Sequence, residues 1–303
     1  MTHPVASSSP DSQPGSGLIR RRAWLRGAGA IAGAGVGAFG WATCVEPFWL
    51  RIALTTLPIL NLPDAWDGKR VVHASDLHLG STNRRYLDHA MGTLAKLEPD
   101  LLILTGDMVD HQSPESIDEL KKLLSPLRAV GGRMLACLGN HDYGMGWRDG
   151  ALADRVCEAM GECGIDVLRN ETRRVNGLQV TGLDDYWAGR LRPLGVFDAV
   201  NGDEAGFCLC HNPDVCDLPV WGRFRGVIFS GHTHGGQCKP PFGAPPRLPV
   251  HNRRYVAGRY PLDDRRQLFI SRGVGYTRQA RFNCRPEINV LTLSRVDADR
   301  VVG

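Results

Sequence analysis

The sequence predicts an α/β fold, and two observations indicate this class. Between residues 70 and 163, short apolar stretches alternate with segments whose apolar residues recur at helical spacing. From Val167 onward, short apolar stretches follow one another without a repeat period. The chain has 303 residues, 43% of them hydrophobic, so it can bury a substantial core in one large domain or two small ones.

The amino-terminal segment is predicted to be an export signal. Residues 1–17 are rich in serine, proline and glycine, which predicts disorder. Basic residues then precede a glycine- and alanine-rich apolar stretch, residues 27–43, in the order typical of a signal. Arg21-Arg22-x-Trp24-Leu25-Arg26 resembles the twin-arginine consensus, which predicts export to the periplasm or another extracytoplasmic site. An ordinary basic amphipathic start is the alternative.

The fate of this signal is left open by the sequence. Gly40-Trp41-Ala42 offers small residues for cleavage, whereas the apolar residues after it favour a retained membrane anchor. We therefore expect three parts in the chain. They are residues 1–45 as disordered start and signal, 46–69 as a lead-in segment, and 70–303 as the main domain.

Five apolar stretches share one feature, which is that each ends in metal-binding residue types. The polar residues concerned are Asp76 and His78, Asp107 and Asp110, Asn140 and His141, His211, and finally His232 and His234. Residues two apart in an extended segment point to the same side, so His73 faces away from Asp76 and His78 and is predicted to be structural. A strand followed by a polar turn explains any one stretch, but the complete set predicts a shared metal site.

The motifs resemble those of the calcineurin-like metallophosphoesterases over about residues 70–293. The matching residues are Asp76-x-His78, Gly106-Asp107-x-x-Asp110, Gly139-Asn140-His141-Asp142, His211 and Gly231-His232-x-His234. This resemblance implies a four-layer αββα sandwich, in which helices flank two mixed sheets. Ser75–Gly80, Gly182–Asp185 and His232–Gln237 are also similar to the YkuE/YaeI-like bacterial subgroup. Some relatives of that subgroup are UDP-2,3-diacylglucosamine pyrophosphatases of lipid A biosynthesis.

The family pattern implies two divalent metal ions that share the carboxylate of Asp107. One ion would be held by Asp76, His78, Asp107 and His234, and the other by Asp107, Asn140, His211 and His232. Carboxylates mixed with imidazoles, without thiolates, favour Mn, Fe or Zn. The implied reaction is hydrolysis of a phosphodiester or pyrophosphate bond by a hydroxide that bridges the metals. Asn140 and His141 would contact the substrate, His141 would protonate the leaving oxygen, and Asp110 would orient His141.

Several residues near these motifs keep two interpretations. Asp142 could support the site or cap a turn, and Asp184 and Asp185 could lie in the cleft or in a surface turn. The loop of residues 239–249, which holds five prolines, could form a rim of the cleft or a plain surface excursion. Other residues with two interpretations are Asn212, Arg253, Arg254 and Arg272, and the aromatic residues Tyr143, Trp147, Tyr186 and Trp187.

The nine cysteines do not predict a structural zinc site, because a second Cys-x-Cys pair is missing. Cys137, Cys208 and Cys210 lie in expected strands and are predicted to be buried as small hydrophobic residues.

The net charge of +4 without a long basic run beyond the amino terminus gives no indication of nucleic-acid binding. The expected partners are a small phosphoester or nucleotide-linked lipid substrate, the twin-arginine export machinery, and a membrane contacted through the amino-terminal segment. A non-catalytic metal-binding scaffold is the alternative class of function. It is disfavoured because every expected ligand position is filled.

Overall fold

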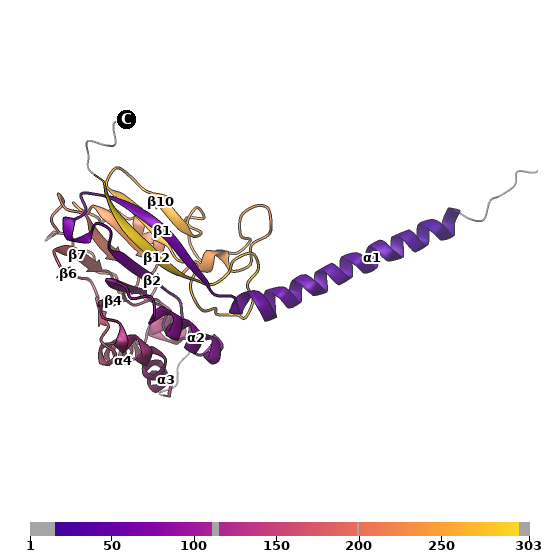
Figure 1. The fold of residues 1–303 in the computed structure, drawn as a ribbon, viewed down its shortest axis with the longest axis horizontal. Coiled ribbons are helices and arrows are strands. Elements are labelled where there is room, and N and C mark those ends of the chain that lie inside the picture. Colours follow the sequence, from indigo (N-terminus) through magenta and orange to yellow (C-terminus); the bar gives the residue numbers. More distant parts are fainter. Residues whose placement is uncertain (1–15, 111–114, 199, 297–303) are drawn as a thin grey trace, which may run out of the picture. The chain divides into compact units, whose positions relative to one another are not determined.

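The computed structural model describes residues 16–110, 115–198 and 200–296 (Figure 1). It divides into two compact units, residues 1–41 and residues 42–303. Of the predicted disordered start, residues 1–15 lie outside the described residues. Its last two residues, Ser16 and Gly17, belong to the helix α1, Ser16–Gly40, so the prediction of disorder is wrong for them.

In the described part of the first unit, α1 is followed only by Trp41, and the described side chains of α1 are largely exposed. The helical stretch Trp24–Phe48 is long enough and apolar enough to cross a membrane, with a mean hydropathy of 1.4. The carboxyl-terminal end of this stretch consists of a π-helix, Trp41–Val45, and a 3-10 helix, Glu46–Phe48. Length and composition together suggest a signal or a membrane anchor at the amino terminus.

The second unit contains two mixed sheets of six strands each. The first has the order β1-β12-β2-β3-β4-β5, formed by Arg51–Leu60, Glu287–Val296, Arg70–Ala74, Leu101–Thr105, Arg133–Cys137 and Asp166–Val167. The second has the order β10-β11-β9-β8-β7-β6, formed by Gly258–Pro261, Arg266–Ile270, Gly226–Ser230, Gly206–Leu209, Leu178–Gly182 and Glu171–Val175. Within each sheet the central strands run parallel, since β2, β3 and β4 pair in parallel, as do β7, β8 and β9.

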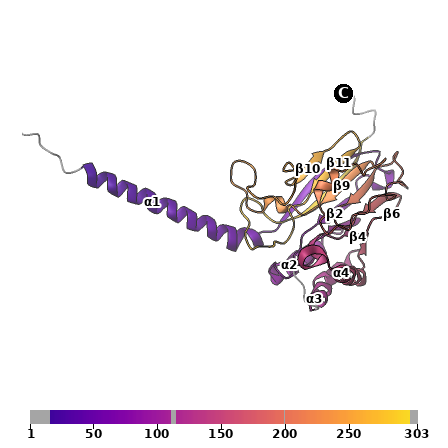
Figure 2. The ribbon, with the colours of Figure 1, turned by 180° about the vertical axis from the view of Figure 1, so that it is seen from behind.

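Three helices cover the outer face of the first sheet (Figures 1 and 2). They are α2, Arg84–Leu94; α3, Glu115–Leu124; and α4, Gly150–Glu162. The side chains of Asn83 and Asp149 cap α2 and α4 by accepting backbone N–H groups. Each helix is shorter than the apolar pattern that predicts it, since these patterns cover residues 84–97, 115–130 and 147–163. The helix α3 gives way to a 3-10 helix, Ser125–Ala129, where Pro126 removes a backbone donor.

One hydrophobic cluster lies between the three helices and the first sheet, and the two sheets pack face to face over a second one. Leu101 and Ile103 of β3 meet Phe207 of β8 and Phe229 of β9 there, all fully buried. A third cluster lies on the outer face of the second sheet, under the 3-10 helix Pro213–Asp217 and neighbouring loops. The predicted pair of mixed sheets flanked by helices is therefore confirmed.

The segment 46–69, expected only as a lead-in, contains a complete strand that sequence reasoning missed. β1 pairs in parallel with β12 along its whole length, from Arg51 opposite Glu287 to Leu60 opposite Val296. Leu57 and Ile59 bury their side chains between the sheets. Pro58 within the strand obscured the signal, although proline is tolerated in an edge strand such as this one.

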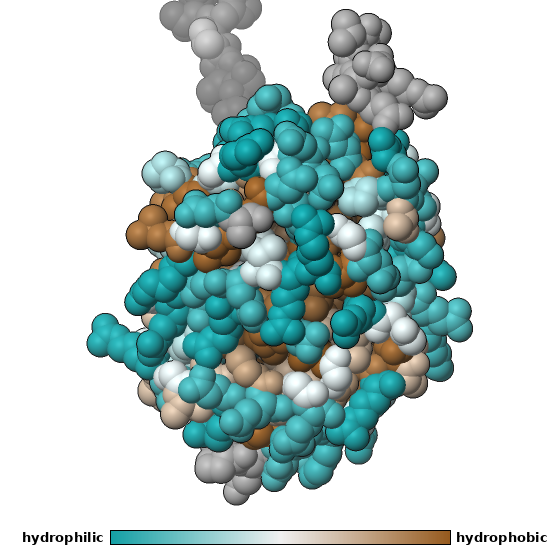
Figure 3. Space-filling view, turned by 90° about the vertical axis from the view of Figure 1, so that its left-hand side faces the viewer, coloured by the Kyte–Doolittle hydropathy of each residue, from teal (hydrophilic) through white to brown (hydrophobic). Residues whose placement is uncertain are grey.

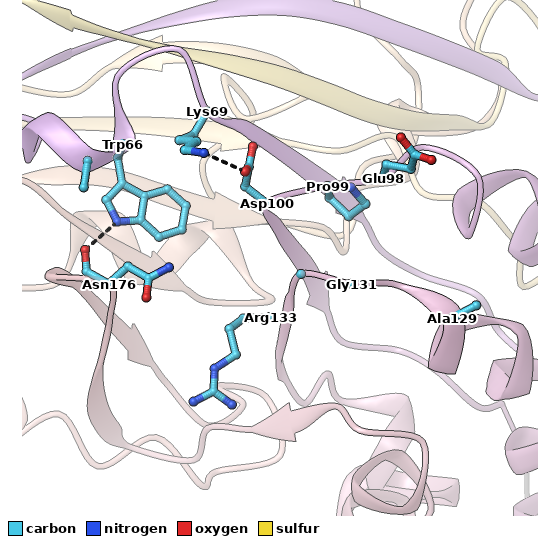
Figure 4. Close-up of a pocket in the computed structure, with 11 residues that line it drawn as sticks. Trp66, Lys69, Glu98, Pro99, Asp100, Ala129, Gly131, Arg133 and Asn176 are labelled. Carbon is cyan, nitrogen blue, oxygen red and sulfur yellow. Dashed lines mark hydrogen bonds and ion pairs between the residues drawn. The ribbon is translucent and has the colours of Figure 1, made fainter.

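The amino-terminal ends of the parallel strands form the edge opposite the predicted site. A cavity of about 640 Å³ lies there, beside the starts of β2, β3 and β4 (Figure 4). Its charged groups are already paired in part, since Lys69 Nζ lies 3.1 Å from Asp100 Oδ1. Hydrophilic side chains cover most of the face on which β6 and β7 lie (Figure 3).

His73 lies in the core between the sheets, as its place in the strand predicted. Its Nε2 lies 2.8 Å from the hydroxyl oxygen of Thr105, and its ring packs edge-on against Phe229 and Phe269. Burial disfavours the charged imidazolium and lowers the pKa of His73 from 6.5 to about 3.

The protein should therefore lose stability as the pH falls through 6.5, because the unfolded chain then binds a proton at His73 that the folded protein refuses. In His73→Gln this contribution is absent. Between pH 6.5 and pH 5 the wild-type free energy of unfolding should fall by about 1.5 kcal/mol more than that of the variant. Urea denaturation at the two pH values measures the difference, and equal losses would contradict a neutral buried His73.

Candidate metal centre

The expected ligands all lie where central strands end and loops begin. Asp76 and His78 follow β2, Asp107 follows β3, Asn140 follows β4, His211 follows β8, and His232 and His234 follow β9. The central strands of each sheet are parallel and the sheets face each other, so these ends meet at one edge of the domain. Asp76, His78, Asp107, His232 and His234 all have positive φ between 45° and 68°. Such left-handed backbone is uncommon outside glycine and typically marks functional sites.

Glycines in the motifs allow the strand ends to approach closely. A Cβ atom on Gly139 would lie 2.3 Å from Asp107 Oδ1, and one on Gly231 would lie 1.9 Å from Ser75 Oγ. Any side chain at either position would therefore displace the groups that form the site.

The first group of ligand atoms comes from the ends of β2, β3 and β9. His78 Nε2 lies 3.0 Å from His234 Nε2 and 3.5 Å from Asp107 Oδ2. Asp76 Oδ1 lies 3.4 Å from His234 Nε2 and 3.8 Å from His78 Nε2. All four side chains are buried or nearly so.

The second group shares the carboxylate of Asp107. His211 Nε2 lies 3.1 Å from Asp107 Oδ2 and also 3.1 Å from His232 Nδ1. Asp107 Oδ2 thus faces both groups. His78, Asp110 and His141 form a further cluster of the same kind. There, however, His141 Nδ1 and Asp110 Oδ1 are already hydrogen-bonded to each other at 2.7 Å.

The donor set fits divalent metal ions. Two imidazole nitrogens that face each other at 3.0 Å need a cation or a proton between their lone pairs. Neither side-chain polar atom of Asn140, which is buried, has a hydrogen-bond partner among the described residues. An unpaired buried amide costs about 1–3 kcal/mol, so its oxygen is available as a ligand. His211 Nδ1 lies 2.7 Å from the carbonyl oxygen of Thr105, an arrangement that directs Nε2 toward Asp107 and His232.

The electrostatics of the site keep its carboxylates charged. Burial alone would raise the pKa of Asp107, but the neighbouring imidazoles, His211 first, hold it well below its ordinary value. Burial also opposes protonation of His211, yet Asp107 raises its pKa to about 10. By contrast, burial lowers the pKa of His232 and His234 to about 3, so both rings are neutral and suited to binding a cation.

His141 differs from the other histidines of the site because part of its side chain, 19%, is exposed. Its Nδ1 is paired with Asp110, whose second oxygen accepts the Ser81 hydroxyl. Burial lowers the pKa of His141, but Asp107 and Asp110 together raise it to about 9. The backbone N–H of His141 donates to Asp107 Oδ1 at 2.8 Å, which holds the backbone of His141 beside this carboxylate.

Asp142 supports the site from beneath and is fully buried. Its carboxylate accepts the backbone N–H groups of Asp107, Met108, Val109 and Gly139 at 2.8–3.2 Å. It therefore ties the loop that carries Asp107 to the loop that carries Asn140 and His141. Burial and the nearby charge of Asp107 raise the pKa of Asp142 to about 6.

Asp184 and Asp185 are buried, which excludes a surface turn. Asp184 accepts hydrogen bonds from the Tyr143 hydroxyl and, at 2.8 Å, from Arg169 Nε. It thereby holds the loop that begins at His141. Asp185 accepts the backbone N–H of Ala188 at 2.6 Å and so shapes the turn that carries Trp187.

The remaining residues with two interpretations have mainly structural contacts. Asn212 Oδ1 accepts the backbone N–H of Asp214 at 2.9 Å. Arg253 donates to the Pro245 carbonyl at 3.0 Å, and Arg272 Nε lies 3.6 Å from Glu287 Oε2.

All nine cysteines are free thiols, and Cys137, Cys208 and Cys210 are buried as predicted.

A cavity of about 820 Å³ opens from the cluster. Its lining includes Asp107, Asn140, His141, His232 and His234 of the site. Trp147 and Trp187 form an aromatic part of the wall, with ring centroids 5.1 Å apart and an interplanar angle of 30°. Trp187 also packs edge-on against His232. Tyr143 and Tyr186, by contrast, pack into the hydrophobic clusters of the core.

The proline-rich loop of residues 239–249 forms another part of the cavity wall. Residues 246–249 line the cavity, and so do residues 277, 278 and 280 of a second segment. Sequence reasoning missed the two exposed cations there, Arg247 and Arg278, because isolated arginines carry no motif signal.

Replacing Asp142 with asparagine should destabilise the protein and loosen the site. The amide would place N–H groups against backbone donors, which we expect to lower the free energy of unfolding by about 2–4 kcal/mol. Asp149→Asn, at the exposed cap of α4, is the matched control and should cost only a few tenths of a kcal/mol. Urea denaturation compares the two, and equal effects would contradict the supporting role of Asp142.

Comparison with known proteins agrees with this geometry. A family model described as calcineurin-like phosphoesterase matches residues 69–236. The chain is 30% identical over 284 residues to phosphodiesterase YaeI of Escherichia coli (strain K12), which covers 91% of this chain and 100% of that protein. It is 30% identical over 292 residues to the uncharacterized metallophosphoesterase YkuE of Bacillus subtilis (strain 168), and this match covers 91% of this chain and 98% of that protein.

A third relative carries a more specific name. The chain is 28% identical over 309 residues to UDP-2,3-diacylglucosamine pyrophosphatase LpxG of Chlamydia trachomatis, with 82% of this chain and 90% of that protein covered. With two mixed sheets, clustered Asp and His ligands and these relatives, the chain belongs to the calcineurin-like phosphoesterase family and is a phosphoric ester hydrolase.

Proposed function

We propose that the protein hydrolyses a phosphodiester or pyrophosphate bond with the help of two divalent metal ions. The observation that carries this proposal is the carboxylate of Asp107, whose Oδ2 faces His78 on one side at 3.5 Å and His211 on the other at 3.1 Å. Two groups of ligand atoms that share one carboxylate are the arrangement used to hold a pair of ions.

In this proposal one ion is held by Asp76, His78, Asp107 and His234, and the other by Asp107, Asn140, His211 and His232. The mixture of carboxylates and imidazoles favours Mn, Fe or Zn. When bound, the ions lower the pKa of water and stabilise negative charge on phosphoryl oxygens.

His141 is the proposed acid that protonates the leaving oxygen. It lines the cavity beside Asp107 and Asn140, and part of its ring is exposed there. Asp110 accepts from Nδ1, which directs Nε2 away from that carboxylate and fixes the orientation of the ring. Asn140 and His141 are also the proposed substrate contacts, because their side chains line the cavity at the ligand cluster.

The size of the cavity favours a substrate with groups on both sides of the phosphorus. A volume of about 820 Å³ is far larger than a phosphate group needs, and the paired indoles of Trp147 and Trp187 offer a surface for an aromatic or apolar group. The names of the relatives YaeI and LpxG, a phosphodiesterase and a pyrophosphatase, support the same choice over a monoester.

We propose that the chain is exported by the twin-arginine route and acts in the periplasm or on the membrane facing it. The apolar helical stretch Trp24–Phe48 supports a signal or an anchor. Arg21 and Arg22 lie within α1, but their side chains are outside the described part of the structure.

Turnover of bis(p-nitrophenyl) phosphate tests the proposed reaction. Metal-stripped protein should be inactive and should regain activity with Mn, Zn or Fe, and it should prefer the diester to p-nitrophenyl phosphate. His141→Ala should keep its metals. With a dialkyl phosphodiester, whose alkoxide leaves poorly, it should lose at least about 100-fold in kcat, because the leaving oxygen then departs unprotonated. With bis(p-nitrophenyl) phosphate the loss should be smaller, because p-nitrophenolate leaves as a stable anion.

His89→Ala, at an exposed position of α2, is the control and should behave like wild type. Wild-type kcat in His141→Ala would contradict the role of the acid. Bound metals without turnover of any phosphoester would favour the scaffold function.

A further inference from the structure

We propose that the mouth of the catalytic cavity rests on the surface of an anionic lipid bilayer, so that the enzyme takes phosphoesters whose apolar part remains in the membrane. This inference rests on the proposed function and names the class of substrate for the same site. Four segments form the proposed membrane-contact face. They are residues 42–50, 145–149, 239–249 and 277–285.

The first observation is the place where the chain enters the domain. Residues 42–50 begin within the apolar stretch Trp24–Phe48, which is the candidate membrane span. The carbonyl of Ala42 accepts the backbone N–H of Arg281 at 2.8 Å, and the carbonyl of Thr43 accepts Gln279 Nε2 at 3.0 Å. Residues 277, 278 and 280, around these contacts, line the catalytic cavity. The chain therefore passes from the apolar stretch directly onto the cavity wall.

Buried polar contacts make this junction firm. Glu46 is 3% exposed, and its carboxylate accepts the backbone N–H groups of Asn283 and Cys284. Arg281 is fully buried and donates to the carbonyl oxygens of Arg272, Gly275 and Cys284. Hydrogen bonds to charged groups are stronger than those between neutral groups, so residues 42–50 are held firmly against the cavity wall. Residues 42–48 belong both to the apolar stretch and to this junction, so a membrane that binds these residues would meet the chain beside the cavity wall.

The second observation is the exposure of large apolar side chains on this face. Phe242 is 93% exposed in the proline-rich loop, whose residues 246–249 line the cavity. Met145 is 84% exposed two residues before Trp147, which lines another part of the cavity. Trp49 is 48% exposed beneath the guanidinium of Arg285. Indole and phenyl rings with this exposure are typical of protein surfaces that enter the interfacial region of a bilayer.

The third observation is the charge of the same four segments. Five of their basic residues are exposed or partly exposed, namely Arg148, Lys239, Arg247, Arg278 and Arg285, whereas Arg281 is fully buried. Their acidic residues are Glu46 and Asp149. Both carboxylates are engaged, Glu46 with backbone N–H groups and Asp149 as the cap of α4. The face thus presents cations around apolar tips, which complements anionic phospholipid. Continuity with an apolar span makes a bilayer, rather than a protein partner, the occupant that these residues fit.

A substrate that enters from this side is amphipathic. Its phosphoester would reach the His and Asp cluster at the inner end of the cavity, while Arg247 and Arg278 lie where the wall is exposed and can meet a second phosphate or a lipid headgroup. Trp147 and Trp187 would contact the group attached to the phosphorus.

Photocrosslinking of the full chain in vesicles tests this face. The photoreactive residue p-benzoylphenylalanine replaces Phe242, Met145 or, as control, Ala129, which is exposed at the opposite edge of the sheet (Figure 4). The vesicles consist of phosphatidylcholine with about one third phosphatidylglycerol. We expect phospholipid to be labelled at least about tenfold more strongly from positions 242 and 145 than from position 129, because only the contact face enters the interface.

A second pair of variants tests the role of charge. Arg247→Gln and Arg278→Gln should each reduce labelling from position 242 by about fivefold, whereas Arg223→Gln, at an exposed position away from this face, should not. Equal labelling from positions 242 and 129 would overturn the inference. If the wild type does not hydrolyse bis(p-nitrophenyl) phosphate, the proposed function fails instead, and the labelling pattern still decides whether this face meets lipid.

Discussion

The site depends on one carboxylate, that of Asp107, being held at the point where several strand ends meet. Its Oδ1 accepts the backbone N–H of His141, and its Oδ2 faces His78 and His211. Asp142 fixes the same residue from below through the Asp107 backbone N–H. The proposed bridging position demands this precision, because a displacement of one oxygen would change both groups of side chains at once.

The cost of that precision is visible in the backbone. Left-handed conformations at Asp76, His78, Asp107, His232 and His234 cost about 1 kcal/mol or more each, and the orphaned amide of Asn140 adds to this. The two sheets offset the cost by burying a continuous apolar core on both sides of β2, β3 and β4. A rigid scaffold thus carries a strained site that bound ions would relieve.

Much of this arrangement could be predicted from the sequence, because ligand types at strand ends leave a local pattern. The period of two in a strand explains the inward-facing His73, which lies within β2. It does not explain Asp76 and His78, because β2 ends at Ala74 and both residues have left-handed backbone, so loop geometry brings their side chains together. The sequence left Asp142 with two interpretations, support of the site or the cap of a turn. It could not decide between them, since the four partners of Asp142 are backbone groups brought together only by folding. The same holds for β1, whose edge position tolerates Pro58, and for Arg247 and Arg278, which reach the cavity from loops.

Metal content of purified variants tests the shared carboxylate most directly. Mass spectrometry of the metal-loaded protein should find about two ions per chain in the wild type. Asp107→Asn should lose both, because it removes charge from both groups, whereas His78→Ala should lose chiefly one. Retention of both ions by Asp107→Asn, or equal loss of both by His78→Ala, would contradict a centre built around Asp107.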